Sequence, residues 1–125
     1  MATIVIVDDS PVVLDRLRLL LEGAGHNVIT VDTPFGASAA IARNSPDLVL
    51  VDVAMPALQG DVLVTIARRR TIAQHAKIVL ISDRTVAELA TLARACGADG
   101  FIQKSRDWPS FLRQVDAYLV ATKEP

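Results

Sequence analysis

Five polar residues stand at or just beyond the ends of apolar runs, and their types could do chemistry together. They are Asp8, Asp9, Asp52, Ser82 and Lys104. Asp52 falls within LVLVDVAMP, a run that otherwise has the composition of a buried strand. An ionised carboxylate in such a place is costly unless a cation or hydrogen bonds compensate its charge. Lys104 and Ser82 are candidates for that compensation, and Asp8 and Asp9 could help to hold a cation beside Asp52.

These side chains suit phosphoryl chemistry if the fold brings them together. Three crowded carboxylates repel one another, and a hard divalent cation such as Mg²⁺, with oxygen ligands and open water positions, would relieve that repulsion. Lys104 would add a compact positive charge without binding the metal, and the Ser82 hydroxyl could donate to a nearby oxygen. Asp52 would then be the nucleophile that attacks phosphorus and becomes an acyl phosphate.

Alternating strands and helices must position these residues. Val- and Ile-rich runs, nearly continuous in apolar character, predict parallel strands covered on both faces. Five strand–helix units predict an α/β fold with a doubly wound parallel sheet, whose strands lie in the order 2-1-3-4-5. In such sheets, ligands bind beyond the carboxyl ends of the strands, where these polar residues gather. The expected strands are 3–7, 27–31, 47–51, 77–81 and 100–103. The expected helices are one that begins at Pro11 and that Gly23 and Gly25 can end, followed by 34–43, 60–69 (or from 61), 85–96 and 108–122.

Composition excludes several classes of protein. The chain has 125 residues, 51% hydrophobic and 22% charged, which indicates one globular domain. A net charge of -1 gives no reason to expect a nucleic-acid or membrane partner. The single cysteine, Cys96, excludes an intramolecular disulfide. No signal peptide or membrane-length apolar run is evident, so we expect a cytoplasmic protein.

Four motifs, in order and on the expected elements, resemble a known family. They are VDDS after the first strand, VDVAMP at the third, LISD at the fourth and GADGFIQK at the fifth. Together they resemble the response-regulator receiver domain of two-component signalling, across residues 1–125. The resemblance implies a flavodoxin-like (βα)5 three-layer sandwich. It also implies a stand-alone, chemotaxis-regulator-like receiver with no output domain, which is a regulatory phosphoacceptor and not an enzyme.

The resemblance also implies a role for each matching position. Asp52 would accept phosphate from a histidine kinase or a histidine phosphotransfer protein. Asp9 and Asp52 would bind Mg²⁺ with the backbone carbonyl of Ala54, and Asp8 would assist through water.

The remaining matches concern the switch itself and its readout. Ser82 would be the switch hydroxyl, Lys104 would contact a phosphoryl oxygen, and Phe101 would be the aromatic residue that swings inward. A downstream protein would bind through the fourth helix, fifth strand and fifth helix, and the chain would be a monomer or weak dimer.

Three positions depart from the family pattern. Ser105 stands where a proline usually follows the lysine, so the next loop is expected to take an unusual path. Asp83 stands where a small residue usually follows the hydroxyl, and its charge would oppose a phosphoryl group unless it points away or pairs with Arg84. Phe101 lacks a tyrosine hydroxyl, so it can report the switch only by packing.

Several alternatives stay open at this point. The chain could be a phosphorelay intermediate or phosphate sink, or a phosphorylation-independent module (a pseudo-receiver) whose pocket Asp83 and Ser105 have closed. A phosphatase of the haloacid-dehalogenase type is rejected because it needs a second aspartate where this chain has Ala54.

Overall fold

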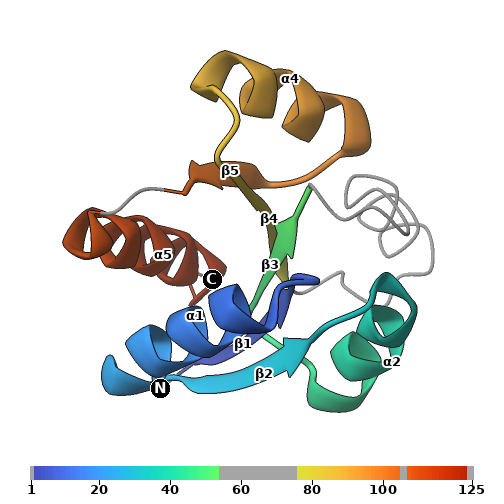
Figure 1. Ribbon diagram of the computed structural model, residues 1–125, viewed down its shortest axis with the longest axis vertical. Coiled ribbons are helices and arrows are strands. Elements are labelled where there is room, and N and C mark those ends of the chain that lie inside the picture. The colour runs from blue at the N-terminus through green and yellow to red at the C-terminus, as the bar shows by residue number, and fades with distance from the viewer. Residues whose placement is uncertain (1, 54–75, 105–106, 124–125) are drawn as a thin grey trace.

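The computed structural model describes residues 2–53, 76–104 and 107–123. In this part of the chain a helix follows each of the first, second, fourth and fifth strands (Figure 1). The expected helix at 60–69, together with Ala54 and Ser105, lies outside the described residues. The strands are β1 (Thr3–Val7), β2 (Asn27–Val31), β3 (Leu48–Asp52), β4 (Lys77–Ser82) and β5 (Gly100–Gln103); the helices are α1 (Pro11–Gly23), α2 (Pro34–Asn44), α4 (Val86–Cys96) and α5 (Trp108–Lys123).

All five strands are parallel and lie in the order β2-β1-β3-β4-β5, as the sequence predicts. The register places Val7 opposite Val51 and Asp52 opposite Ile81. The carboxyl ends of β1, β3 and β4 therefore finish side by side. The strand bounds differ slightly from expectation, since β3 begins at Leu48 and includes Asp52.

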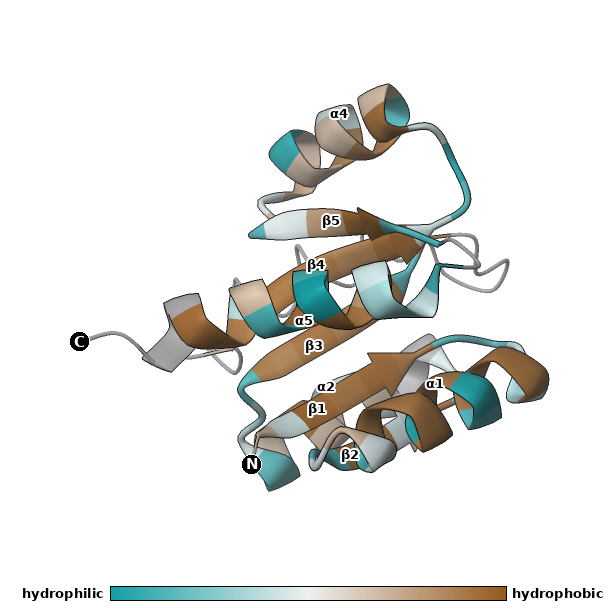
Figure 2. Cartoon of the chain, turned by 90° about the vertical axis from the view of Figure 1, so that its left-hand side faces the viewer, coloured by the Kyte–Doolittle hydropathy of each residue, from teal (hydrophilic) through white to brown (hydrophobic). Residues whose placement is uncertain are grey.

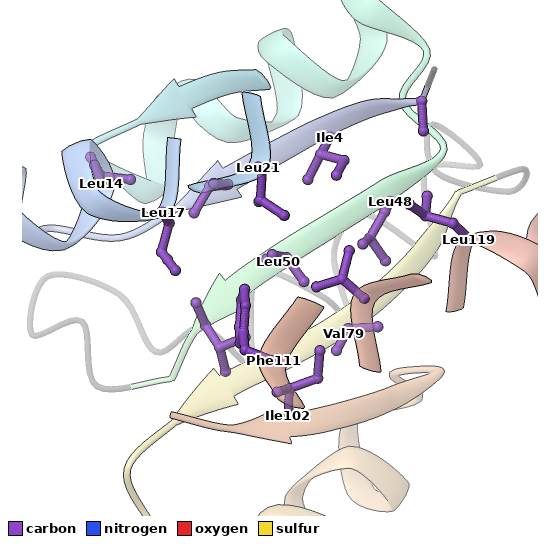
Figure 3. Packing of buried hydrophobic residues seen from close by; sticks show 14 residues of the cluster. Ile4, Leu14, Leu17, Leu21, Leu48, Leu50, Val79, Ile102, Phe111 and Leu119 are labelled. Carbon is purple, nitrogen blue, oxygen red and sulfur yellow. The ribbon is translucent and has the colours of Figure 1, made fainter. Parts of the chain in front are cut away.

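Apolar side chains fill both faces of the sheet. Strands β1, β3 and β4 are buried along almost their whole length, and hydropathy marks them as continuous apolar bands, whereas the helices carry polar residues outward (Figure 2). On one face, α1 and α5 pack against the sheet through residues such as Leu17, Leu50 and Phe111 (Figure 3). On the other, α2 and α4 pack through Ile41 and Leu89. These are the three layers of the predicted sandwich.

Helix ends follow the local signals in the sequence. Ser10 caps α1 by accepting a hydrogen bond from the Val13 amide, and Pro11 occupies the first turn. Thr85 caps α4 in the same way, and Gly97 ends it with a φ of 80°, which favours glycine. These caps set where α1 and α4 begin, directly after the loops that follow β1 and β4. Among the described helices, none combines the length and the apolar character needed to cross a bilayer.

Candidate phosphoacceptor and metal site

Three aspartates meet at the carboxyl edge of the sheet. Asp8 directly follows β1 and Asp52 ends β3, and these strands are neighbours. One carboxylate oxygen each from Asp8, Asp9 and Asp52 lies within 4.8 Å of the others. Asp8 is 1% exposed and Asp52 4% exposed, whereas Asp9 faces solvent. The predicted acidic cluster is therefore present, buried on one side and open on the other.

Lys104 supplies the cation that the buried Asp52 requires. Its Nζ lies 3.2 Å from Asp8 Oδ2 and 3.6 Å from Asp52 Oδ2. The Lys104 backbone is held as well, because its amide donates to the Ser82 carbonyl over 2.6 Å. The ammonium thus reaches from the end of β5, across β4, to carboxylates at the ends of β1 and β3.

The residues present fit a divalent cation. Three carboxylates against one ammonium leave two formal negative charges in the cluster. All the candidate ligands are oxygen atoms, and the exposed Asp9 leaves a side from which water could complete the coordination that Mg²⁺ prefers. Asp8 Oδ1 also accepts a hydrogen bond from the Ser10 amide at 3.0 Å, which orients its carboxylate. Ala54, the expected carbonyl ligand, lies outside the described residues.

Ser82 lies at the end of β4, one residue beyond Ile81, which pairs with Asp52. It is 1% exposed, and its Oγ accepts a hydrogen bond from the Arg84 amide at 3.1 Å. The hydroxyl is thus next to the acidic edge of the sheet and engaged with the loop that leads to α4. Asp83, the departure beside it, is exposed to solvent.

Phe101 lies on β5 and packs, half-buried, against the core cluster on the α2 and α4 face. Its backbone is held from outside the sheet: the Phe101 amide donates to the Tyr118 hydroxyl at 3.2 Å, and that hydroxyl donates to the Phe101 carbonyl at 3.3 Å. This role of Tyr118 was not predicted from the sequence. The signal available was a polar tip on the otherwise apolar stripe of the last helix.

A small cavity of about 150 Å³ adjoins the site between α1 and α5. Lys104, Trp108 and Phe111 line it, together with Val12, Val13, Arg16 and Leu17 of α1. The Arg16 guanidinium lies over the Trp108 ring, 6.0 Å from its centroid. The Trp108 indole and the Lys104 side chain therefore line the same cavity.

The chain resembles proteins of one signalling family over nearly all its length. The family profile of the response regulator receiver domain matches residues 4–116. The transcriptional regulatory protein KdpE of Mycobacterium tuberculosis (strain CDC 1551 / Oshkosh) is 33% identical over 94% of this chain, which spans 50% of that regulator's length.

Two further relatives match this chain along nearly their whole length. Protein PilH of Pseudomonas aeruginosa is 27% identical over 95% of this chain and 98% of its own. The solved structure of the chemotaxis protein CheY4 of Vibrio cholerae superposes with a TM-score of 0.87 at 25% identity, and the match covers 94% of this chain and 98% of CheY4. The chain spans about half the length of the first curated relatives it matches, and nearly all of the length of PilH and CheY4.

Proposed function

Because the chain belongs to the response regulator receiver domain family, we propose that it is a phosphorylation-operated signalling switch with Asp52 as its phosphoacceptor. The observation that carries this proposal is the environment of Asp52: a buried carboxylate next to two further acids and 3.6 Å from a lysine ammonium. A histidine kinase or a histidine phosphotransfer protein would donate the phosphoryl group. The chain would be a regulatory phosphoacceptor in the cytoplasm, not an enzyme that turns over a separate substrate.

Each residue of the site would have a separate role in phosphoryl transfer. Asp8, Asp9 and Asp52 would hold Mg²⁺, with the Ala54 carbonyl as a further ligand, and the metal would neutralise charge on the phosphoryl oxygens. Asp52 Oδ attacks phosphorus in line, the bond from phosphorus to the donor nitrogen breaks, and the donor histidine keeps that electron pair. Lys104, which already contacts two of the carboxylates, would turn toward a phosphoryl oxygen.

The signal would be a shift between two populated conformations. A phosphoryl group on Asp52 that binds the Ser82 hydroxyl and Lys104 better in one conformation favours that conformation by the difference in affinity. Phe101 packs against the core on the α4 side of the sheet. Its packing would change when the Ser82 hydroxyl moves. A downstream protein would then read the face made of α4, β5 and α5.

The alternative of a phosphorylation-independent module depends on a closed pocket. Asp83 is exposed and Asp9 faces solvent, which supports an open site. A phosphorelay intermediate or phosphate sink uses the same site chemistry. Transfer of labelled phosphate between Asp52 and a histidine phosphotransfer protein separates this role from that of an end-point switch.

Intact mass after incubation with acetyl phosphate and Mg²⁺ tests the proposal. We expect one phosphoryl addition to the wild-type chain that requires Mg²⁺ and is absent in Asp52→Asn. Asp32→Asn, which changes an aspartate at the end of β2, is the matched control and should accept phosphate normally. A folded wild-type chain that gains no mass would overturn the proposal in favour of the phosphorylation-independent module.

A further inference from the structure

The connection between β4 and α4 is tied to the neighbouring strand by one side chain. Gln103, the last residue of β5, is exposed, and its Nε2 donates to the Arg84 carbonyl at 3.0 Å. Gln103 pairs through its backbone with Ser82, so the side chain reaches over the end of β4 to the loop beyond it. No chemistry proposed above uses this hydrogen bond.

Arg84 is held at both its backbone groups. Its carbonyl accepts from Gln103, and its amide donates to Ser82 Oγ at 3.1 Å. Ser82 is itself anchored, because its carbonyl accepts from the Lys104 amide. The hydroxyl of Ser82, the Arg84 backbone and the Gln103 amide therefore form one continuous chain of hydrogen bonds.

This arrangement opposes the movement that the switch requires. If the Ser82 side chain rotates to bring Oγ to a phosphoryl group on Asp52, Oγ leaves the Arg84 amide, and that amide loses its partner unless the Arg84 backbone moves as well. The hydrogen bond from Gln103 holds the Arg84 backbone in the position at which the Arg84 amide donates to the Ser82 hydroxyl. A bond present in only one of two conformations shifts the equilibrium toward that conformation.

We propose that Gln103 is a positioning residue that holds the β4–α4 connection, and through it the Ser82 hydroxyl, in the arrangement of the unphosphorylated chain. The effect of Gln103 on the switch rests on the proposed function, but its restraint on Arg84 can be measured without phosphate. A single neutral hydrogen bond at an exposed position corresponds to about a two- to fivefold shift in equilibrium.

The first test measures the restraint itself. Exchange of the Arg84 amide hydrogen with water, followed by NMR without any phosphodonor, should be about two- to fivefold faster in Gln103→Leu and Gln103→Glu. Leu removes the donor without adding charge, and Glu keeps the size but offers no donor to a carbonyl. Gln114→Leu, at an exposed glutamine on α5, is the matched control and should leave exchange at Arg84 unchanged. Unchanged exchange in both Gln103 variants overturns the proposal.

The second test measures the consequence for the switch. With acetyl phosphate and Mg²⁺, the Gln103→Leu chain should be phosphorylated about two- to fivefold faster than the wild type. The free energy of unfolding of Gln103→Leu in urea should not exceed that of the wild type. A residue that only supported the fold would slow phosphorylation or leave it unchanged, and that result refutes the role in the switch. An increase in Gln103→Glu alone would assign the effect to charge and also refute it. If the wild type takes no phosphoryl group at Asp52, the proposed function fails, and exchange at Arg84 still decides whether Gln103 restrains the loop.

Discussion

The Lys104 ammonium lies close to two buried carboxylates at once, 3.2 Å from Asp8 and 3.6 Å from Asp52. It partly neutralises the charge of each, yet three acids still outnumber it. The same ammonium repels a divalent cation that those acids would bind. Lys104 therefore plays two opposed parts: it stabilises the site without metal and weakens the binding of the metal.

Removing the Lys104 charge should therefore change Mg²⁺ affinity and the phosphorylation rate in opposite directions. Lys104→Met should tighten Mg²⁺ binding by on the order of tenfold, because one positive charge a few ångströms from the metal is removed. It should also slow phosphorylation by acetyl phosphate, because a phosphoryl oxygen loses its cation. Calorimetric titration with Mg²⁺ and intact mass measure the two effects. Lys77→Met, at the opposite end of β4, should change neither. Weaker Mg²⁺ binding in Lys104→Met would contradict this account of the charges.

At the scale of elements, β5 is a four-residue edge strand, and α5 satisfies part of its open edge. The Tyr118 hydroxyl takes the place of a neighbouring strand for Phe101, since it bonds both the amide and the carbonyl. An unpaired strand edge invites pairing with another chain, and a side chain that covers it removes that opportunity. The hydroxyl also joins the proposed switch residue directly to α5, one of the elements of the proposed output face.

Removing that hydroxyl should loosen the attachment of α5 to β5. Tyr118→Phe keeps the ring in the core and leaves the Phe101 backbone groups without this partner. We expect a loss of about 1–2 kcal/mol in the free energy of unfolding, measured by urea titration with circular dichroism. Unchanged stability would show that water replaces the hydroxyl at no cost.

Gly100 depends on the same contact. A Cβ at position 100 would overlap the Tyr118 hydroxyl and ring, so the residue must be glycine while the ring keeps its place. Gly100→Ala should therefore destabilise the wild-type chain more than it destabilises a Tyr118→Leu chain, in which the hydroxyl and the aromatic ring are gone. A double-mutant cycle measures this difference as a coupling free energy. Additive effects would show that the ring moves aside freely.

At the scale of the whole molecule, the sheet edge carries a cluster of like charges that folding creates. In the unfolded chain Asp52 is far along the sequence from the adjacent Asp8 and Asp9, whereas in the folded chain one carboxylate oxygen from each of the three lies within 4.8 Å of the others. Repulsion in this cluster opposes folding when no metal is bound. A cation that binds only the folded site removes this cost and stabilises the whole domain by mass action.

Mg²⁺ should accordingly raise the resistance of the chain to unfolding. At a free concentration ten times its Kd, the expected gain is about 1.4 kcal/mol, seen as a higher urea midpoint. Asp9→Asn should reduce this gain, and should stabilise the metal-free chain because one repelling charge is lost. Asp15→Asn, at an exposed acid on α1, should leave the Mg²⁺ effect intact. A midpoint that does not respond to Mg²⁺ would contradict the assignment of a metal site.

Residue order alone was sufficient for the strands and helices that the structure describes and for grouping the polar residues at the ends of the strands. Apolar runs such as TIVIV and KIVLI are too continuous for half-exposed strands, so a parallel sheet covered on both faces follows from them. Ser10-Pro11 and Gly97 mark helix ends by local chemistry. Asp8, Asp52 and Lys104 could be grouped because parallel strands bring their carboxyl ends to one edge.

The tertiary structure decided which groups touch. That Lys104 contacts Asp8 more closely than Asp52, that Tyr118 bonds the backbone of Phe101, and that Gln103 holds Arg84 are all contacts between distant segments or across strands. Sequence patterns report the period and the polarity of each element, which are local properties. The reach and direction of a side chain toward another element depend on strand register and helix rotation, and only the packed molecule determines these.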